Sequence, residues 1–176
     1  GEVSRESFRA LWLGRAPDGT PLVQNPDARG RQRAWDLTFS VPKSVSLLWA
    51  MSEPEVRIGI QAAQAGAVSA ALSYLEREAG VTRRGKGGAV LERAALVAST
   101  FEHGTSRAKD PQLHTHVLVL NVGVREDGTT GTLHSKPLYA HKMAAGALYR
   151  MELSHGFRAL GFETKASRIG FEVVGV

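Results

Sequence analysis

Hydrophobic and polar residues alternate in several short segments of the chain, a pattern typical of half-buried β-strands. In RAWDLTFSV (33–41), Trp35, Leu37 and Phe39 occupy alternate positions. The same alternation predicts strands over AALVASTFEH and LHTHVLVLNV, and two short strands in the tail FETKASRIGFEVVGV (94–103, 113–122 and 162–176). The turn-rich segment REDGTTGTLH predicts a hairpin around Asp127-Gly128.

Helical segments separate these strands. SVPKSVSLLWAM (40–51) predicts a short helix with Ser40 as its N-cap and Pro42 in its first turn. Longer helices are predicted from Pro54 to about residue 78 and over 136–160, where Gly161 follows as a C-terminal cap. Residues 14–34 and the basic, glycine-rich segment 82–88 are predicted as loops. This order favours an α+β fold, a central antiparallel sheet with helices packed on one face.

The composition limits the classes of protein to which the chain can belong. The 176 residues, 43% hydrophobic and 22% charged, are ordinary for one globular domain. No apolar stretch approaches the roughly 20 residues of a membrane helix, so we expect no membrane insertion. The absence of cysteine excludes disulfides and thiolate metal sites. The net charge of +5 permits a nucleic-acid partner. The chain begins at Gly1 and ends in a strand-like segment, which suggests a fragment truncated at both ends.

Two histidines stand one residue apart in DPQLHTHVLVLNVG (110–123). Side chains alternate along a strand, so His114 and His116 point to the same side. If residues 104–113 form a loop, His103 lies opposite His114 on the neighbouring strand, with Cβ atoms about 5 Å apart. Three imidazoles on one surface can hold a divalent transition metal. The alternative is that these are ordinary hydrogen-bonded residues at strand ends. His134, His141 and His155 lie in predicted turn or helix segments without a partner at ligand spacing, so we expect them to be structural.

WDLTFSVPKSVSLLWA followed by FEHGTSRAKDPQLHTHVLVLN resembles the relaxase domain of conjugative plasmid relaxases, the TraI/TrwC (MobF) class of the HUH endonucleases. The resemblance implies a two-layer sandwich fold and a bacterial cytoplasmic enzyme. It also implies metal-dependent, site- and strand-specific nicking of single-stranded or extruded DNA at a transfer origin, through a 5′-phosphotyrosine. One divalent ion (Mn, Mg, Zn, Ni or similar) and accessory relaxosome proteins are implied, with no nucleotide cofactor. A helicase domain can follow Val176 in such proteins.

The resemblance also implies roles for individual residues. His103, His114 and His116 are the metal ligands, and Asp36 orients a histidine or assists deprotonation of the nucleophile. Lys43 and Ser44 lie at a helix N-terminus, which favours phosphate. Further basic residues are predicted to follow the DNA backbone, and these are Arg29, Arg31, Arg33, Arg83, Arg84, Lys86, Arg107 and Lys109. Ordinary capping and solvated surface charge are the alternative interpretations of these residues.

The nucleophilic tyrosines of the family precede the region that aligns with Gly1. The chain contains Tyr74, Tyr139 and Tyr149, all within predicted helices, and we expect them to be core residues. We therefore expect a metal site and a DNA-binding surface without the nucleophile, and no efficient covalent adduct with DNA.

Two other functions stay open. The first is a non-catalytic module of the same fold that binds single-stranded DNA. The second is a rolling-circle replication initiator or transposase of the same superfamily, which requires Tyr139 or Tyr149 to be exposed toward His114. An unrelated three-histidine oxygenase is disfavoured, because the nearest carboxylate, Asp110, lies in a predicted loop.

Overall fold

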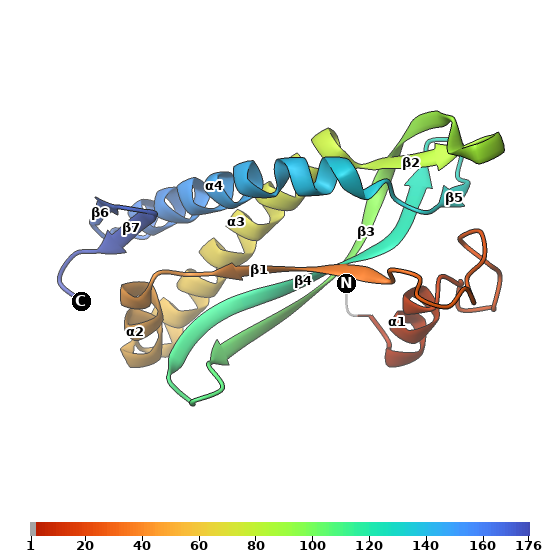
Figure 1. The fold of residues 1–176 in the computed structure, drawn as a ribbon. Coiled ribbons are helices and arrows are strands. Elements are labelled where there is room, and N and C mark those ends of the chain that lie inside the picture. The colour runs from red at the N-terminus through yellow and green to blue at the C-terminus, as the bar shows by residue number, and fades with distance from the viewer. Residues whose placement is uncertain (1–2) are drawn as a thin grey trace. The chain divides into compact units, whose positions relative to one another are not determined.

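The alternating segments form an antiparallel sheet in the order β1-β4-β3-β2, and β5 pairs with β4 (Figure 1). The structure is a computed structural model that describes residues 3–176. A second sheet contains β6 and β7. The strands of the two sheets are β1 (Ala34–Ser40), β2 (Val81–Arg84), β3 (Val90–Thr105), β4 (Pro111–Arg125), β5 (Thr130–Gly131), β6 (Thr164–Ser167) and β7 (Gly170–Val173).

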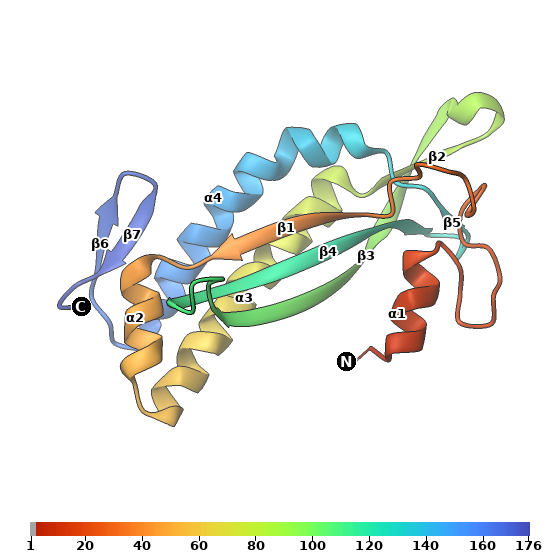
Figure 2. The same cartoon turned by 60° about the horizontal axis from the view of Figure 1, so that its bottom comes forward.

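One helix precedes β1 and the other helices occupy segments between the strands, as Figure 2 shows from another direction. They are α1 (Arg5–Trp12), α2 (Lys43–Met51), α3 (Pro54–Ala79), the short 3-10 helix η1 (Lys86–Gly88) and α4 (Ser135–Ala159). The predicted long helices and the α+β class are confirmed. The predicted cap at Gly161 is also confirmed, because this residue has a φ of 87° and its N–H donates to the Arg158 carbonyl. The β4–β5 turn contains Gly128 at a φ of 78°, as a hairpin at Asp127-Gly128 requires.

Three predicted boundaries are wrong. Ser40 is still part of β1, and the cap position of α2 is Pro42, which makes no side-chain cap. Val81–Arg84 is a strand, because these residues pair with β3 from Arg93 to Val90. The predicted loop 104–113 shrinks to residues 106–110. Its tight turn is possible because the Ser106 hydroxyl accepts hydrogen bonds from the amides of Ala108 and Asp110.

The sequence pattern did not predict α1. Phe8, Leu11 and Trp12 nevertheless have helical spacing, and Phe8 and Trp12 bring their ring centroids to 6.1 Å. The Ser4 hydroxyl caps this helix by accepting a hydrogen bond from the Ser7 amide at 3.1 Å. Serine before a helically spaced apolar set was the available signal.

The chain divides into two compact units. The first unit comprises the described residues up to Leu37, Leu75–Thr100 and Val117–His141. The second unit comprises Thr38–Tyr74, Phe101–His116 and Lys142–Val176. That residues 1–176 form a single relaxase domain stays a prediction.

The second unit contains the predicted histidine site. Its core includes Val45, Ile60, Leu113, Leu153 and Phe157, which have no exposed surface. Leu113 and Thr115 of β4 face this core, and Thr115 contacts Gln64 of α3. Because side chains alternate along a strand, His114 and His116 point away from it.

Across the described residues 3–176, no helix combines the length and the apolar character needed to cross a membrane.

Candidate metal centre

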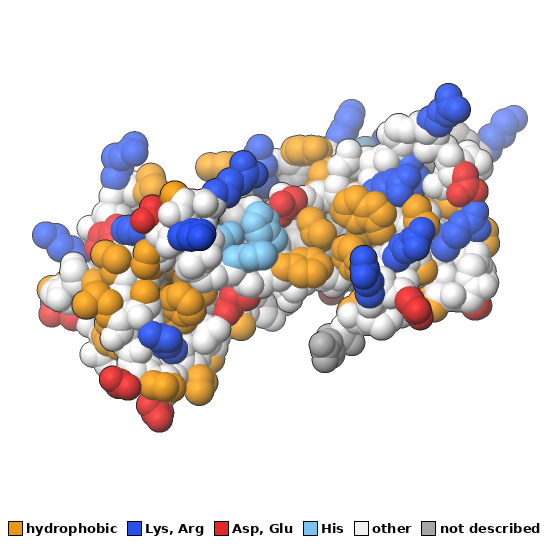
Figure 3. Space-filling model, turned by 90° about the horizontal axis from the view of Figure 1, so that it is seen from below, with side chains coloured by type: hydrophobic (Ala, Val, Ile, Leu, Met, Phe, Trp, Pro, Cys, Tyr) orange, Lys and Arg blue, Asp and Glu red, His pale blue; other side chains and the backbone are white. Residues whose placement is uncertain are grey.

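Three imidazole rings lie together on the second unit. The ring centroids of His103 and His114 are 5.3 Å apart, those of His103 and His116 are 5.5 Å apart, and those of His114 and His116 are 5.1 Å apart. His103 is exposed and the other two are half-buried. Figure 3 shows a compact patch of histidine side chains on one face of the molecule. The predicted convergence of β3 and β4 at these residues is therefore present in the structure.

The donor set fits a divalent ion. Metal–nitrogen distances of about 2.0–2.1 Å in tetrahedral geometry place the centroids of two bound imidazoles about 5 Å apart. The three observed separations are close to this value. Within residues 3–176, no three His, Asp or Glu side chains have their donor atoms already arranged around an ion. The χ2 torsion of histidine is soft, so the rings can turn their nitrogens inwards without a backbone change.

Hydrogen bonds to Nδ1 orient two of the rings. His114 donates from Nδ1 to the carbonyl oxygen of Gln112 at 2.8 Å. This bond places the proton on Nδ1 and leaves Nε2 as the lone-pair donor. His116 Nδ1 lies 3.3 Å from the Thr38 hydroxyl on β1. Partners of this kind orient histidine ligands in metal sites. The sequence pattern singled out neither Thr38 nor Gln112.

The PKSVS segment holds the start of β4. The Lys43 ammonium donates to the Pro111 carbonyl at 2.9 Å, and the buried Ser46 hydroxyl accepts from the Leu113 amide at 3.1 Å. Ser44, predicted to bind phosphate, is 8% exposed; its hydroxyl donates to the Glu172 carboxylate and accepts from the Val173 amide. In this conformation, Lys43 and Ser44 bind protein groups.

Arg107 and Lys109 are exposed in the loop between β3 and β4. This loop belongs to the same unit as the three histidines. Lys109 has a φ of 65°, an uncommon value for a residue other than glycine. Of the predicted DNA contacts, these two are closest in the chain to the three histidines.

Arg83, Arg84 and Lys86 belong to the first unit. Lys86 is exposed in η1, and the Arg83 Nε lies 3.3 Å from His134 Nδ1. Arg84 is paired with Asp127 at 2.8 Å and with Glu92 at 3.2 Å. Arg84 therefore joins neighbouring strands, whereas Lys86 presents its charge to solvent.

The ARGRQR segment also lies in the first unit, and its arginines differ. Arg29 and Arg33 are exposed. Arg31 donates from Nη2 to the Trp12 carbonyl at 3.0 Å, and its Nε and Nη1 atoms are buried. Burial lowers the pKa of Arg31, and the nearby charge of Arg33 lowers it further. The three guanidinium groups therefore do not form the single aligned face that an extended chain predicts.

Asp36 is exposed on β1, two residues before Thr38. It belongs to the first unit, and its role at the metal centre stays a prediction.

The tyrosines do not share one environment. Tyr149 is 2% exposed and packs against Phe39 with ring centroids 5.0 Å apart, as expected for a core residue. Burial raises the pKa of Tyr149 well above its ordinary value, which opposes formation of a nucleophilic phenolate. Tyr74 is half-buried. Tyr139 is 58% exposed, so the expectation that it is a core residue is wrong.

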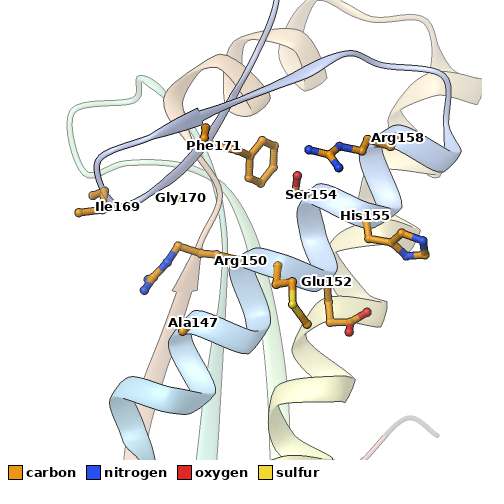
Figure 4. Close-up of a pocket in the computed structure, with 11 residues that line it drawn as sticks. Ala147, Arg150, Glu152, Ser154, His155, Arg158, Ile169, Gly170 and Phe171 are labelled. Carbon is orange, nitrogen blue, oxygen red and sulfur yellow. The ribbon is translucent and has the colours of Figure 1, made fainter.

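A separate hollow of about 780 Å³ lies between α4 and the β6–β7 hairpin (Figure 4). Phe171 reaches from the hairpin towards Ser154 and Arg158 of α4, and Arg158 donates to the Thr164 hydroxyl at 2.8 Å. The described lining residues come from α4 and the hairpin, whereas the histidines lie on β3 and β4. We therefore assign this hollow no part in the metal centre.

Comparison with known proteins places the chain in a family. The family model described as TrwC relaxase matches residues 1–176. The multifunctional conjugation protein TraI of Escherichia coli (strain K12) is 38% identical over 177 residues, which cover 94% of this chain and 10% of that protein. The chain therefore spans about a tenth of the length of this relative.

Solved structures of the conjugative relaxase TrwC in complex with oriT DNA are also similar. A metal-bound structure has a TM-score of 0.87 at 32% identity, covering 100% of this chain and 61% of that chain. A metal-free structure has a TM-score of 0.87 at 32% identity, covering 100% of this chain and 63% of that chain. The fold, the histidine cluster and the match along all 176 residues lead to one conclusion: the chain belongs to the TrwC relaxase family.

Proposed function

We propose that this chain carries the metal centre and the DNA-binding surface of a relaxase, which nicks one DNA strand at a conjugative transfer origin. The observation that carries the proposal is the cluster of His103, His114 and His116, with ring centroids 5.1 to 5.5 Å apart. Similarity to TrwC structures that hold oriT DNA, with and without metal, supports it.

In this proposal the three histidines bind one divalent ion through ring nitrogens. The bound ion supplies Lewis-acid polarisation of the scissile phosphate. Gln112 and Thr38 contact Nδ1 of the His114 and His116 rings, which leaves Nε2 of each ring for the ion. We assign to Asp36 the orientation of a histidine or help with deprotonation of the nucleophile.

The reaction proposed for the whole protein is transesterification through a 5′-phosphotyrosine. The P–O bond to the departing 3′ oxygen breaks as the tyrosine oxygen forms a new ester, so the strand can be rejoined without a nucleotide cofactor. We do not assign the nucleophile to Tyr149, because its hydroxyl is buried and donates to the side-chain oxygen of Gln64 at 2.6 Å.

The DNA backbone is proposed to contact exposed basic residues. Arg107 and Lys109 do so beside the histidine strands, and Arg29, Arg33 and Lys86 do so on the first unit. Lysine and arginine neutralise backbone phosphates and release counterions, so this binding depends on salt. Action in the bacterial cytoplasm with accessory relaxosome proteins is part of the same proposal, supported by the similarity to a conjugation protein.

Metal stoichiometry tests the proposal most directly. The purified chain is incubated with Mn, Ni or Zn, desalted and measured by elemental analysis, beside a His114→Ala, His116→Ala double variant. We expect about one ion per chain, lost in the double variant, because two of three ligands are gone. A His155→Ala variant is the matched control, since His155 is exposed on α4 outside the cluster.

Absence of metal from both the wild type and the double variant would contradict the metal centre. A DNA-binding module without catalysis would then be the better interpretation. Equal metal content in the wild type and the double variant would show that the ion is bound elsewhere.

A further inference from the structure

A buried polar network lies beneath the histidine strand, on the face that points into the core of the second unit. Gln64 of α3 has no exposed surface. Its side-chain amide donates to the Phe39 carbonyl at 3.1 Å and lies 3.2 Å from the Thr115 hydroxyl. Its side-chain oxygen accepts a hydrogen bond from the Tyr149 hydroxyl at 2.6 Å. One glutamine therefore links β1, β4 and α4.

The atoms that Gln64 contacts are next to the groups of the metal centre in both strands. Thr115 stands between His114 and His116, and Phe39 follows Thr38, the partner of His116. The Val41 amide donates to the Leu113 carbonyl at 3.2 Å. Since β1 and β4 are antiparallel, this bond also places Thr38 across from His116 and Phe39 across from Thr115. A shift of β1 against β4 would separate both pairs.

Packing alone does not account for a glutamine at this position. The network lies in a core that includes Val45, Ile60 and Leu153, where a leucine would bury apolar surface without a polar group. Burying an amide is unfavourable unless its hydrogen bonds are made, whereas a satisfied network favours one arrangement of its elements. The network therefore favours a single register of the strands over a purely apolar contact.

A second buried hydroxyl acts on the same strand. Ser46 is 1% exposed and accepts a hydrogen bond from the Leu113 amide. Ser46 and Gln64 thus hold residues 113 and 115, which flank His114 on the reverse face.

We propose that Gln64 is a positioning residue of the metal centre: held by Tyr149, its amide fixes β1 and β4 in the register that brings His114, His116 and Thr38 together. The inference rests on the proposed metal centre. It also gives Tyr149 a function other than attack on DNA.

The test compares Gln64→Leu and Tyr149→Phe with a matched control. Phe157→Leu is the control, because Phe157 is fully buried in the same unit and packs against Phe162 and Phe171 outside the network. The dissociation constant for Ni²⁺ is measured by calorimetry at a temperature where circular dichroism shows every variant folded. Loss of outer partners of metal-bound histidines weakens binding about 10- to 100-fold, and we expect about tenfold for Gln64→Leu.

Tyr149→Phe removes a single oxygen atom and is expected to weaken Ni²⁺ binding in the same direction, by less. Phe157→Leu is expected to lower the melting temperature and leave the dissociation constant unchanged. Within the network, Thr115→Val should weaken metal binding and Thr115→Ser, which keeps the hydroxyl, should restore it. Equal affinities in Gln64→Leu and wild type, or an equal loss in Phe157→Leu, would overturn the proposal.

Amide hydrogen exchange in the metal-free chain tests the positioning role of Gln64 separately from the proposed metal centre. Gln64→Leu should accelerate exchange at residues 113–117 more than Phe157→Leu does, because the strand loses its fixed register. If the wild type binds no metal, the proposed metal centre is wrong. The exchange comparison still shows whether Gln64 fixes the register of the strand. Unchanged exchange in Gln64→Leu would contradict the positioning role.

Discussion

At the scale of single residues, side chains beside the three histidines orient their rings. Thr38 is one of them, since its hydroxyl lies 3.3 Å from His116 Nδ1. Lys43 and Ser44 donate to the Pro111 carbonyl and the Glu172 carboxylate, where a phosphate site was predicted. A polar residue near a motif can therefore bind either a DNA phosphate or another group of the protein. Only the contacts in the structure show which partner it has.

Replacement of Thr38 by valine should weaken metal binding about tenfold, because the outer partner of His116 is lost while the shape of the side chain is kept. Calorimetric titration of the purified variant with Ni²⁺ measures this change. Thr105→Val is the control, because Thr105 is exposed near the end of β3 in the same unit. An unchanged affinity in Thr38→Val would show that the Thr38 hydroxyl does not orient His116.

At the scale of elements, the Asp127 carboxylate makes several hydrogen bonds in the β4–β5 hairpin. Asp127 accepts hydrogen bonds from the amide and hydroxyl of Thr129 at 3.0 and 2.6 Å, and from Arg84 of β2 at 2.8 Å. The hydrogen bonds from Thr129, followed by that from Arg84, hold the pKa of Asp127 well below its usual range. Because the pKa is depressed in the folded state, the carboxylate stabilises the fold above the unfolded value of about 3.9, and this contribution is lost as the pH falls.

Asp127→Asn should therefore reduce the pH dependence of stability between about pH 5 and pH 2. Melting temperatures measured across this range should fall more steeply in the wild type than in the variant. Glu126→Gln, a neutralising change at the adjacent residue, should keep the steep wild-type profile. Parallel profiles for Asp127→Asn and wild type would mean that the hairpin does not depend on the charge of Asp127.

At the scale of the whole molecule, charge predicts how DNA binding responds to salt. The net charge is +5, and Lys86, Arg107 and Lys109 are exposed. The logarithm of the affinity for a single-stranded transfer-origin oligonucleotide should fall linearly with the logarithm of salt concentration, by about 0.7 per phosphate neutralised. The proposed DNA surface thus has a measurable electrostatic signature.

Lys86→Ala should weaken this binding and reduce the salt slope by about 0.7, because one phosphate contact is lost. Fluorescence anisotropy at several salt concentrations gives both quantities. Lys165→Ala removes an equal charge from an exposed position on β6 that is outside the predicted DNA-contacting set. Identical slopes in the two variants would show that net charge, and not a contact at Lys86, governs binding.

Features that depend on residues adjacent in the chain could be predicted from the sequence alone. Alternation in LHTHVLVL places His114 and His116 on one side of β4, and the apolar run assigns the other side to the core. The long helices followed from their composition and from Gly161, and the hairpin from Asp127-Gly128. Each of these is a local preference of the backbone, so it can be read from a few consecutive residues.

Features that join distant segments became known only from the folded arrangement of the chain. The contact of Thr38 with His116 and the network of Gln64, Thr115 and Tyr149 connect segments up to 85 residues apart. These contacts depend on strand register and on which helix covers which face. Register and packing are set by the simultaneous burial of many side chains, so no local pattern in the sequence specifies them.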